Sequence, residues 1–421
     1  MKNRYIKNLL LLLLAMIVPV LVYSQVQGCT DTLAGNFNVS ATINDGSCLY
    51  TSAMYTPVIK VDPITDSLIE SSGLQMADNF LWSFNDGGNP PQLYRIDTAT
   101  NTLLQRVILS VATNVDWEDI AFDGTYFYVG DFGNNLNGAR TDLKIYKFPL
   151  SAIPAYAANP VVNITAQQTS IISFTYSDQP QPPVATTSNN TRFDCEAMIV
   201  DNGEIHLFTK NWIDKNTTHY VINSTDAGAY TATPVETLAT NYLVTAADKV
   251  AGQNIIVLLG YQNSGTGNHY LHILSDYKAD SFFSGNKRKI DLPDATVMGQ
   301  SEGITFRKGR YGYISNEKFV RSVGPFTITV NQKLRSFDIS NYVTDHFTTY
   351  IFTGNGNWSD RINWQYNQPP PPTLVAGNEI IIDPLAGGKC ELDIPYILAA
   401  GVKLTVNAGK SFFIRGNLAR Q

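Results

Sequence analysis

The chain has 421 residues, of which 30 are Lys or Arg and 36 are Asp or Glu, so its formal net charge at pH 7 is −6. An acidic chain without long basic runs is poorly suited to nucleic acid or to anionic membrane surfaces, and we exclude both as expected partners. Aromatic residues make up 11% of the chain, and no long stretch has helical periodicity, so the composition predicts an all-β protein.

The first 24 residues have the pattern of a secretory signal peptide. Lys2, Arg4 and Lys7 precede an apolar stretch at 9–22, which is too short to span a bilayer. We therefore expect residues 1–24 to be removed. The mature protein should then have no transmembrane segment and should be secreted or held at the cell surface.

Residues 25–53 form a short segment rich in Asp and Asn, with Cys29 and Cys48 near its ends. Export permits disulfides, so we expect these two cysteines to pair and Cys195 and Cys390 to stay free and buried. The segment resembles a module with the pattern GCTD to DGSC from exported proteins of Bacteroidetes-type bacteria. Its Asp and Asn side chains offer oxygen ligands for calcium, but a disulfide-closed linker built from turn residues is the simpler interpretation.

Between residues 54 and 345 the chain repeats itself five times. Each repeat has a small or acidic turn that enters an apolar strand, then a second strand that ends in polar residues, and then a third strand. The turns are at 70–74, 116–120, 194–198, 245–248 and 301–304, and the second strands are at 80–86, 126–135, 204–212, 254–263 and 311–317. A spacing of roughly 50 residues suits one four-stranded propeller blade per repeat.

One interval, between the second and third repeats, is longer because of a Pro- and Ser-rich loop at 179–190. The fifth repeat has no clear fourth strand, whereas residues 55–62 form a strand-like segment before the first repeat. We therefore predict a five-bladed β-propeller, alternatively six-bladed if the long interval hides a degenerate blade. Its N-terminal strand would join the last blade and remove the open edge.

Residues 346–421 differ in character from the repeats. The stretch TGNGNWSDRINW at 353–364 is followed by a Pro-rich run at 369–372 and by short apolar strands separated by Gly. Short strands with regularly spaced turns predict a small β-solenoid or sandwich-like module. The segment resembles β-solenoid-like appendages of surface proteins in the same bacterial group.

The innermost strands of a propeller line its central channel, so polar residues at equivalent positions of the repeats should converge at one mouth. Crowded carboxylates raise one another's pKa unless a cation is present, and calcium takes six to eight hard oxygen ligands. The metal-ligand candidates are Glu70, Asp116, Glu118, Asp131, Glu196, Asp248 and Glu302. The five His show no zinc-ligand spacing, no Cys-x-x-Cys occurs, and no nucleophile elbow or phosphate-binding glycine loop is present, so zinc and covalent serine or cysteine catalysis are disfavoured.

Two cations stand among these acids, Arg140 and Lys210. A cation beside metal-binding carboxylates suits an anionic ligand, and metal-assisted hydrolysis of a phosphoric ester would follow from that layout. The expected ligand-binding residues are Arg140, Lys210, Asn134, Asn135 and Glu317. The catalytic candidates for such a calcium-dependent hydrolase are Glu118, Asp131, Glu196 and Glu302.

The motifs SSGL, LWSFND, DWEDIA, YVGDFGNN, LFTKNW, EGITF and YISNE resemble the phytase-like exported β-propellers, over most of residues 66–320. The resemblance implies a propeller fold and a proposed esterase or phosphatase activity. We expect an exported propeller whose acidic mouth binds calcium and a small anionic or carbohydrate ligand. The alternatives are a phytase-like metal-dependent phosphoesterase and a structural cell-surface scaffold, in which the repeated acids only tie neighbouring blades together.

Overall fold

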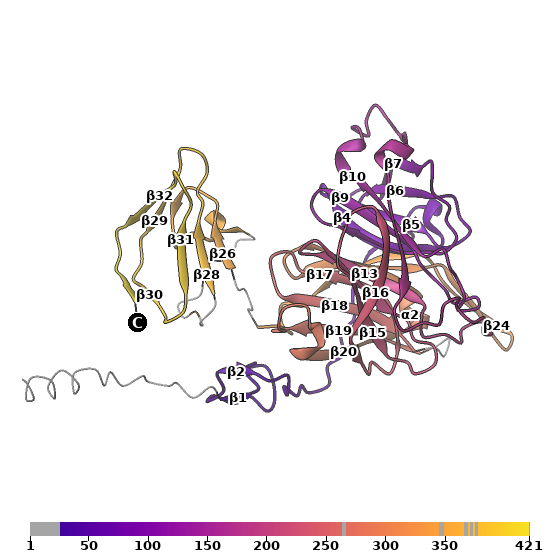
Figure 1. Ribbon diagram of the computed structural model, residues 1–421, viewed down its shortest axis with the longest axis horizontal. Helices are drawn as coiled ribbons and strands as arrows, with labels where there is room; N and C mark the ends of the chain where they lie inside the picture. Colours follow the sequence, from indigo (N-terminus) through magenta and orange to yellow (C-terminus); the bar gives the residue numbers. More distant parts are fainter. Residues whose placement is uncertain are drawn as a thin grey trace, which may run out of the picture.

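The computed structural model describes residues 26–262, 267–344, 349–365, 369–370, 374 and 378–420. The predicted signal peptide and the predicted boundary at residue 345 lie outside the described residues. Within them the protein is almost entirely β-structure, as the composition predicts, and the main body is propeller-like (Figure 1).

The first strands of the five repeats form a closed ring. Each contacts the first strand of the next repeat, and the last of them contacts the first. In ring order these inner strands are β4 (Ser71–Ala77), β8 (Trp117–Phe122), β13 (Cys195–Asp201), β17 (Leu243–Lys249) and β21 (Gln300–Lys308). Almost every residue in them is buried, because each strand packs against two neighbouring inner strands as well as pairing with its own sheet.

Each inner strand pairs antiparallel with a second strand, and a third strand follows outward. The second strands are β5 (Phe80–Asn85), β9 (Tyr126–Asp131), β14 (Glu204–Thr209), β18 (Ile255–Tyr261) and β22 (Tyr311–Glu317). The third strands are β6 (Gln92–Asp97), β10 (Lys144–Pro149), β15 (Thr217–Ile222), β19 (Asn268–Ser275) and β25 (Lys333–Asp338). The predicted order of strands in the repeats is confirmed.

The fourth strands, counted outward from the ring, are β7 (Thr102–Leu109), β12 (Ser170–Tyr176), β16 (Gly228–Leu238), β20 (Asn286–Asp294) and β3 (Val58–Val61). The last of these comes from the beginning of the chain and pairs antiparallel with β25, with Leu334 opposite Val61. The segment expected to join the final sheet does so. This pairing satisfies the outer backbone groups of β25 and connects the two ends of the repeat region.

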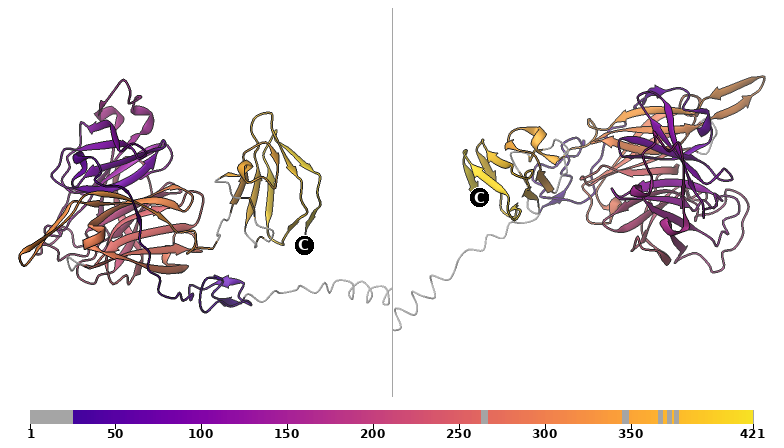
Figure 2. Two further views of the ribbon diagram at one scale, coloured as in Figure 1. Left: turned by 180° about the vertical axis from the view of Figure 1, so that it is seen from behind. Right: turned by 90° about the horizontal axis from the view of Figure 1, so that it is seen from above.

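The long interval contains a connection between sheets. Strand β11 (Val161–Ile164) crosses over to pair in parallel with β7. Strand β12 then pairs in parallel with β16, which joins two four-stranded units into one eight-stranded sheet. The sequence predicted neither pairing. A second unpredicted feature is the hairpin of β23 (Phe319–Val323) and β24 (Phe326–Val330), which projects from the body (Figure 2).

The hydrophobic core lies between adjacent sheets. Trp82 and Trp117 are completely buried in one of these layers, where the Trp82 ring packs 5.0 Å from Phe127 and the Trp117 ring packs 5.3 Å from Phe84. Burying side chains of this size stabilises the fold by about 1.5–3 kcal/mol each. These layers hold each inner strand at a fixed place around the channel.

The N-terminal segment docks on the outer strands of the fourth sheet. Strands β1 (Gln27–Gly28) and β2 (Ile43–Asn44) pair in parallel, and the predicted Cys29–Cys48 disulfide is present. Asn44 donates to Asp276 Oδ2 at 2.8 Å and to Asn286 Oδ1 at 2.8 Å. Within the segment, Asp31 Oδ1 accepts from Leu33 N at 2.9 Å and Asp31 Oδ2 accepts from the Tyr50 hydroxyl at 2.6 Å, which fits a linker of turns rather than a calcium site.

The C-terminal strands stack in parallel. They are β26 (Thr349–Phe352), β27 (Gly356–Asn357), β28 (Glu379–Ile382), β29 (Lys389–Leu392), β30 (Tyr396–Leu398), β31 (Lys403–Val406), β32 (Ser411–Ile414) and β33 (Leu418–Arg420). They form three small parallel sheets, as in a β-solenoid, around buried Trp358 and Trp364. Cys195 and Cys390 are free and buried, as predicted.

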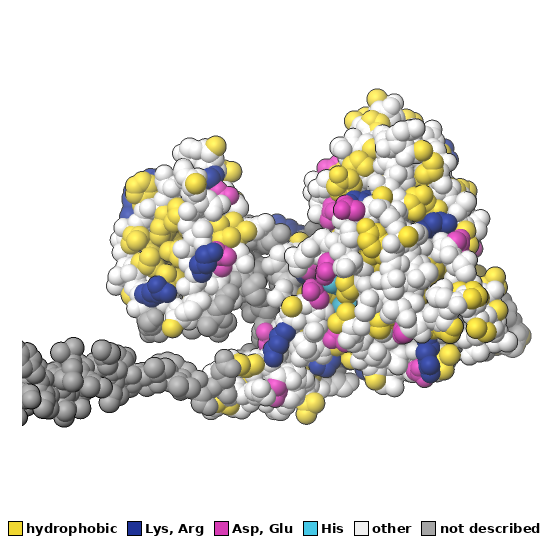
Figure 3. Space-filling view, viewed as in Figure 1, with side chains coloured by type: hydrophobic (Ala, Val, Ile, Leu, Met, Phe, Trp, Pro, Cys, Tyr) yellow, Lys and Arg dark blue, Asp and Glu magenta, His cyan; other side chains and the backbone are white. Residues whose placement is uncertain are grey.

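Apolar side chains are also visible on the surface of this C-terminal part (Figure 3). Phe413 and Ile414 of β32 are each 52% exposed. No helix among the described residues has the length and apolarity needed to cross a membrane.

Candidate functional site

A β-bulge near the beginning of each inner strand organises one end of the channel. The register with the second strand shifts at the same place in all five. A bulge inserts an unpaired residue and redirects its side chain. The inserted residues are Ser72 with Gly73 in β4, Glu118 in β8, Glu196 in β13, Thr245 in β17 and Glu302 in β21. Three glutamates are therefore brought to one level of the ring.

Next to the ring, three carboxylates from two sheets meet. Asp86 follows β5, while Asp116 and Glu118 lie at the beginning of β8, and one carboxylate oxygen of each lies within 4.8 Å of the others. Two glycines border this cluster. A Cβ atom on Gly133 would lie 2.2 Å from Glu118 Oε1, and one on Gly87 would lie 2.6 Å from Asp116 Oδ1. The cluster occupies space that a larger residue at either position would fill.

The electrostatics of this cluster favour a bound cation. Burial, together with the charge of Glu302, raises the pKa of Asp86 to about 6. Burial, together with Asp86 and Asp194, raises the pKa of Asp116 to about 7. The pKa of Glu118 is raised well above its usual value, first by burial and then by Glu196. Since three converging oxygen donors match the ligands that calcium prefers, the residues fit such an ion.

The third repeat contributes a cation, Lys210, that is in direct contact with one of the three glutamates. Lys210 Nζ lies 3.1 Å from Glu196 Oε1, and both side chains are almost fully buried. The ammonium group also lies over the rings of Trp212 and Tyr261, 5.1 Å and 5.4 Å from their centroids. Burial opposes the charged form of Lys210, but Glu196, Tyr261, Glu302 and Asp194 together outweigh it, and the pKa is raised. Lys210 is therefore held as a cation by one carboxylate and two aromatic faces.

Glu302 lies on the other side of the mouth. Its Oε1 atom accepts hydrogen bonds from the Tyr261 hydroxyl at 2.9 Å and from Gln300 Nε2 at 2.8 Å. Its Oε2 atom is buried and has no hydrogen-bond partner among the described residues. A buried carboxylate oxygen without a donor is costly, so this atom is positioned to accept from a ligand hydroxyl or to contact an ion.

A cavity of about 320 Å³ opens beside these residues. Its lining combines aromatic, amide and cationic side chains, including Trp212, Tyr261, Asn135, Gln300 and Lys210. Aromatic faces with a few convergent polar groups are the usual composition of small-ligand sites. Of the predicted ligand-binding residues, Lys210 and Asn135 line this cavity.

Arg140, Asn134 and Asp131 instead build the loop that follows β9. Arg140 donates to Asp131 Oδ1 at 2.8 Å and to the Gly133 carbonyl at 2.8 Å. The Asn134 side-chain oxygen accepts from Arg140 N at 3.0 Å. The guanidinium is therefore committed to its own loop and is not among the residues lining the cavity.

The remaining candidates are dispersed. Glu70 Oε2 accepts a hydrogen bond from Asn89 Nδ2 at 2.7 Å, and this bond is exposed to solvent. Glu317 is half-buried at the end of β22, and its pKa is raised first by burial and then by Glu302. Asp248 does not join the acidic mouth, because its carboxylate accepts from Phe306 N at 2.6 Å in the next inner strand. It lies further along β17 and lines another cavity together with Lys249.

Sequence reasoning missed the aromatic half of the site. Tyr261 is the last residue of β18, just as Asp131 is the last residue of β9. Because Tyr261 carries no charge, it was not predicted as a site residue. Gln300 begins β21 beside the predicted Glu302. Repeat position was therefore the signal that could have identified Tyr261.

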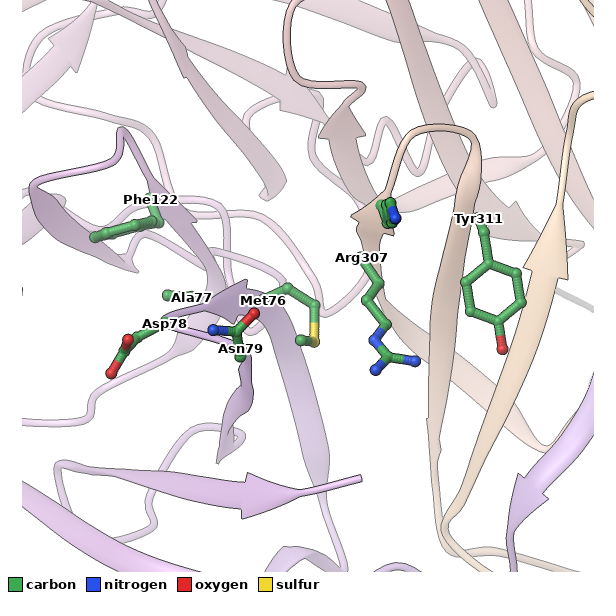
Figure 4. Close-up of a pocket in the computed structure, with 8 residues that line it drawn as sticks. Met76, Ala77, Asp78, Asn79, Phe122, Arg307 and Tyr311 are labelled. Atoms are coloured by element: carbon green, nitrogen blue, oxygen red, sulfur yellow. The ribbon is translucent and has the colours of Figure 1, made fainter. Parts of the chain in front are cut away.

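The opposite end of the channel is lined by other types of side chain. A cavity of about 780 Å³ lies there between β4 and β21. Met76 and Asn79 lie on one side of it, and Arg307 and Tyr311 on the other (Figure 4). Its single acidic lining residue, Asp78, is paired with Arg95 at 2.7 Å. The described lining of this cavity therefore contains no cluster of carboxylates like the one formed by Asp86, Asp116 and Glu118.

No model of a known protein family matches the chain, and no curated protein matches it. Among solved structures, it is similar to the PQQ-bound aldose sugar dehydrogenase from Streptomyces coelicolor, with 10% identity over 68% of this chain and 98% of that chain and a TM-score of 0.36. It is also similar to Kuenenia stuttgartiensis hydrazine synthase, with 11% identity over 70% of this chain and 73% of that chain and a TM-score of 0.31. At such scores the assignment of the fold rests on the ring of inner strands, and the function rests on the site itself.

Proposed function

We propose that this chain is an exported, five-bladed β-propeller that binds calcium and a small carbohydrate-like ligand at its acidic mouth. The observation that carries the proposal is the cavity of about 320 Å³ at the mouth, where Trp212, Tyr261 and amide side chains accompany Lys210, the partner of Glu196. Aromatic faces pack on the apolar faces of sugar rings, while amides and carboxylates bond to hydroxyls.

The charge balance favours a neutral polyol over an anion. Lys210 is the cavity's one Lys or Arg among the described lining residues, and Glu196 already neutralises it. Arg140 is bonded to Asp131 and is absent from the lining. A phosphate would need several free cations to offset the repulsion of the surrounding carboxylates, so the phosphoesterase alternative is the weaker candidate.

In this proposal calcium is held by Asp86, Asp116 and Glu118, with backbone or ligand oxygens completing its coordination. Its role is to neutralise the cluster and to offer a site for ligand hydroxyls. Export rests on the N-terminal apolar pattern and fits the Cys29–Cys48 disulfide. We assign residues 25–53, 54–345 and 346–421 to the Cys-bounded module, the propeller and the C-terminal module.

The test is a titration of the mature chain with a panel of soluble neutral and phosphorylated oligosaccharides, followed by tryptophan fluorescence with and without calcium. We expect a neutral sugar to bind and the Trp212→Ala variant to lose that binding. Lys308→Ala, at the other end of the channel, is the matched control. Preferential binding of phosphorylated sugars, or equal binding by Trp212→Ala, would reject the proposal.

A further inference from the structure

A second group of possible metal ligands lies away from the mouth. Glu204 and His206 are on β14, and Asp280 precedes the short 3-10 helix η4 (Phe282–Ser284) of the neighbouring sheet. One ligand atom from each of the three residues lies within 4.8 Å of the others. His206 is completely buried, while both carboxylates are half-buried, so the group is open to solvent on its acidic side.

A chain of hydrogen bonds orients the His206 ring. Glu236 Oε1 lies 3.3 Å from His219 Nδ1, and His219 Nε2 lies 2.9 Å from His206 Nδ1. Glu236 Oε1 also accepts from the backbone N–H of Phe283 at 3.0 Å. An ionised carboxylate only accepts, so His219 donates from Nδ1 and accepts at Nε2. His206 then donates from Nδ1, which places its free lone pair on Nε2.

Two buried polar atoms at this place have no hydrogen-bond partner. They are His206 Nε2 and the Tyr277 hydroxyl oxygen, in residues that are 0% and 7% exposed. Burial, followed by the charges of Asp201 and Asp280, raises the pKa of Tyr277. Orphaned buried polar atoms are rare in folded proteins, because each one forfeits its interactions with water.

The surroundings supply acceptors and no spare cation. Lys249 forms an ion pair with Asp201, and neither Glu204 nor Asp280 pairs with a Lys or Arg in the described part of the chain. An imidazole lone pair and two carboxylates that face one another repel unless a positive charge lies between them. Lys249 is close enough to act on His206, but Asp201 neutralises it, so a metal ion or a proton on the ring would supply the missing positive charge.

We propose that Glu204, His206 and Asp280 bind a divalent transition-metal ion, for which Zn²⁺ is the best match. Imidazole nitrogen with carboxylate oxygen suits zinc, whereas calcium takes oxygen ligands only. The Glu236–His219 pair is the outer shell that orients a metal-ligating histidine. Because β14 and Asp280 belong to neighbouring sheets, the ion would tie these two sheets together.

Sequence spacing could not reveal this site. Its ligands are separated by more than 70 positions between His206 and Asp280, and the sheet packing brings them together. The site is independent of the mouth, since it shares none of the residues in the Asp86 cluster. A failure of the calcium proposal would therefore leave the zinc proposal standing.

The first experiment measures Zn²⁺ binding to the chelator-treated mature chain by calorimetry, with Co²⁺ absorption as a second readout. We expect one high-affinity site, a higher Tm on Zn²⁺ addition, and affinity weakened by at least about tenfold in Glu204→Gln and Asp280→Asn. These half-exposed residues can change without opening a core cavity. Glu118→Gln, at the mouth, should keep the Zn²⁺ site. Unchanged affinity in both ligand variants, or no zinc binding by the unmodified chain, would overturn the proposal.

A second experiment distinguishes the metal from a proton. Nitrogen NMR of the imidazoles in the metal-free chain should show His206 neutral with an unprotonated Nε2, and Zn²⁺ should shift that nitrogen. Burial, followed by the charges of His219 and Lys249, lowers the pKa of His206 to about 3, and the Asp201 backbone carbonyl near the ring opposes this shift. A proton found on Nε2, insensitive to Zn²⁺, would show that this carbonyl satisfies the ring and that no metal site exists.

Discussion

Lys210 and Glu196 form an ion pair of 3.1 Å inside the mouth, where almost no solvent reaches either side chain. They lie on neighbouring strands of the same sheet, with Lys210 directly after β14 and Glu196 at the bulge of β13. Burying two charges is costly, and the cost is recovered only while both partners are present. The Lys210–Glu196 pair therefore limits the net negative charge at the mouth.

Removing one partner should be more damaging than removing both. We expect Lys210→Met to destabilise the protein by about 3–5 kcal/mol at pH 8, because Glu196 would be left buried and unpaired beside Glu118 and Glu302. The double variant Lys210→Met/Glu196→Gln should recover most of that loss. Urea unfolding of the two single variants and the double variant measures the coupling. Additive losses would show that the two side chains do not stabilise each other.

Stability without divalent cations should fall as pH rises. The folded-state pKa of Asp116 is about 7 against an ordinary 3.8, and that of Asp86 is about 6. The folded state thus binds more protons than the unfolded state between about pH 4 and pH 7, and unfolding becomes easier across that window. After allowance for solvent screening the loss is on the order of 1–2 kcal/mol. Thermal unfolding from pH 4.5 to 8 should show it, and calcium should flatten the slope above pH 6. A Tm that rises through this range in chelator would contradict the assignment.

Gly133 offers a way to disturb the cluster without removing a carboxylate. Its added Cβ would lie 2.2 Å from Glu118 Oε1 and 2.5 Å from Asp116 Oδ2, so both acids must move. We expect Gly133→Ala to weaken calcium binding by at least about tenfold in a calorimetric titration, comparable with the loss of a supporting contact. Gly35→Ala, where the nearest atom would be 3.7 Å away, is the matched control. Equal affinity in the two variants would place the calcium elsewhere.

The sequence predicts the strand order well because each repeat is encoded locally. The alternation of apolar residues and the polar strand ends recur in every unit, and residues 55–62 stand out as an extra strand. The pairing of β11 with β7 and of β12 with β16 could not be predicted, because it joins segments whose contact depends on the course of long loops. The hairpin at 319–330 has no counterpart in the other repeats.

Only the charged residues of the site could be predicted from the sequence. The repeats identified Glu118, Glu196 and Glu302, but the β-bulge that unites them is a property of the backbone. Asp248 looked equivalent and is not, because it lies three residues beyond its bulge and bonds to the next strand. Tyr261 was missed, since an uncharged residue at a strand end resembles ordinary core.

Asp119 shows what ties the inner strands together, and it provides the last prediction. Its carboxylate accepts from Met198 N in the next inner strand at 2.7 Å and from Ile120 N at 2.8 Å. Asp119→Ala leaves two buried donors unpaired and should cost about 2–6 kcal/mol in urea unfolding, at roughly 1–3 kcal/mol per donor. Calcium affinity should be unchanged, because Asp119 is not in the cluster. Asp97→Ala, which removes the same kind of bond at an exposed turn, should cost much less, because water can replace the lost acceptor. If the two variants were equally stable, contacts between adjacent inner strands would have to be held by side-chain packing alone.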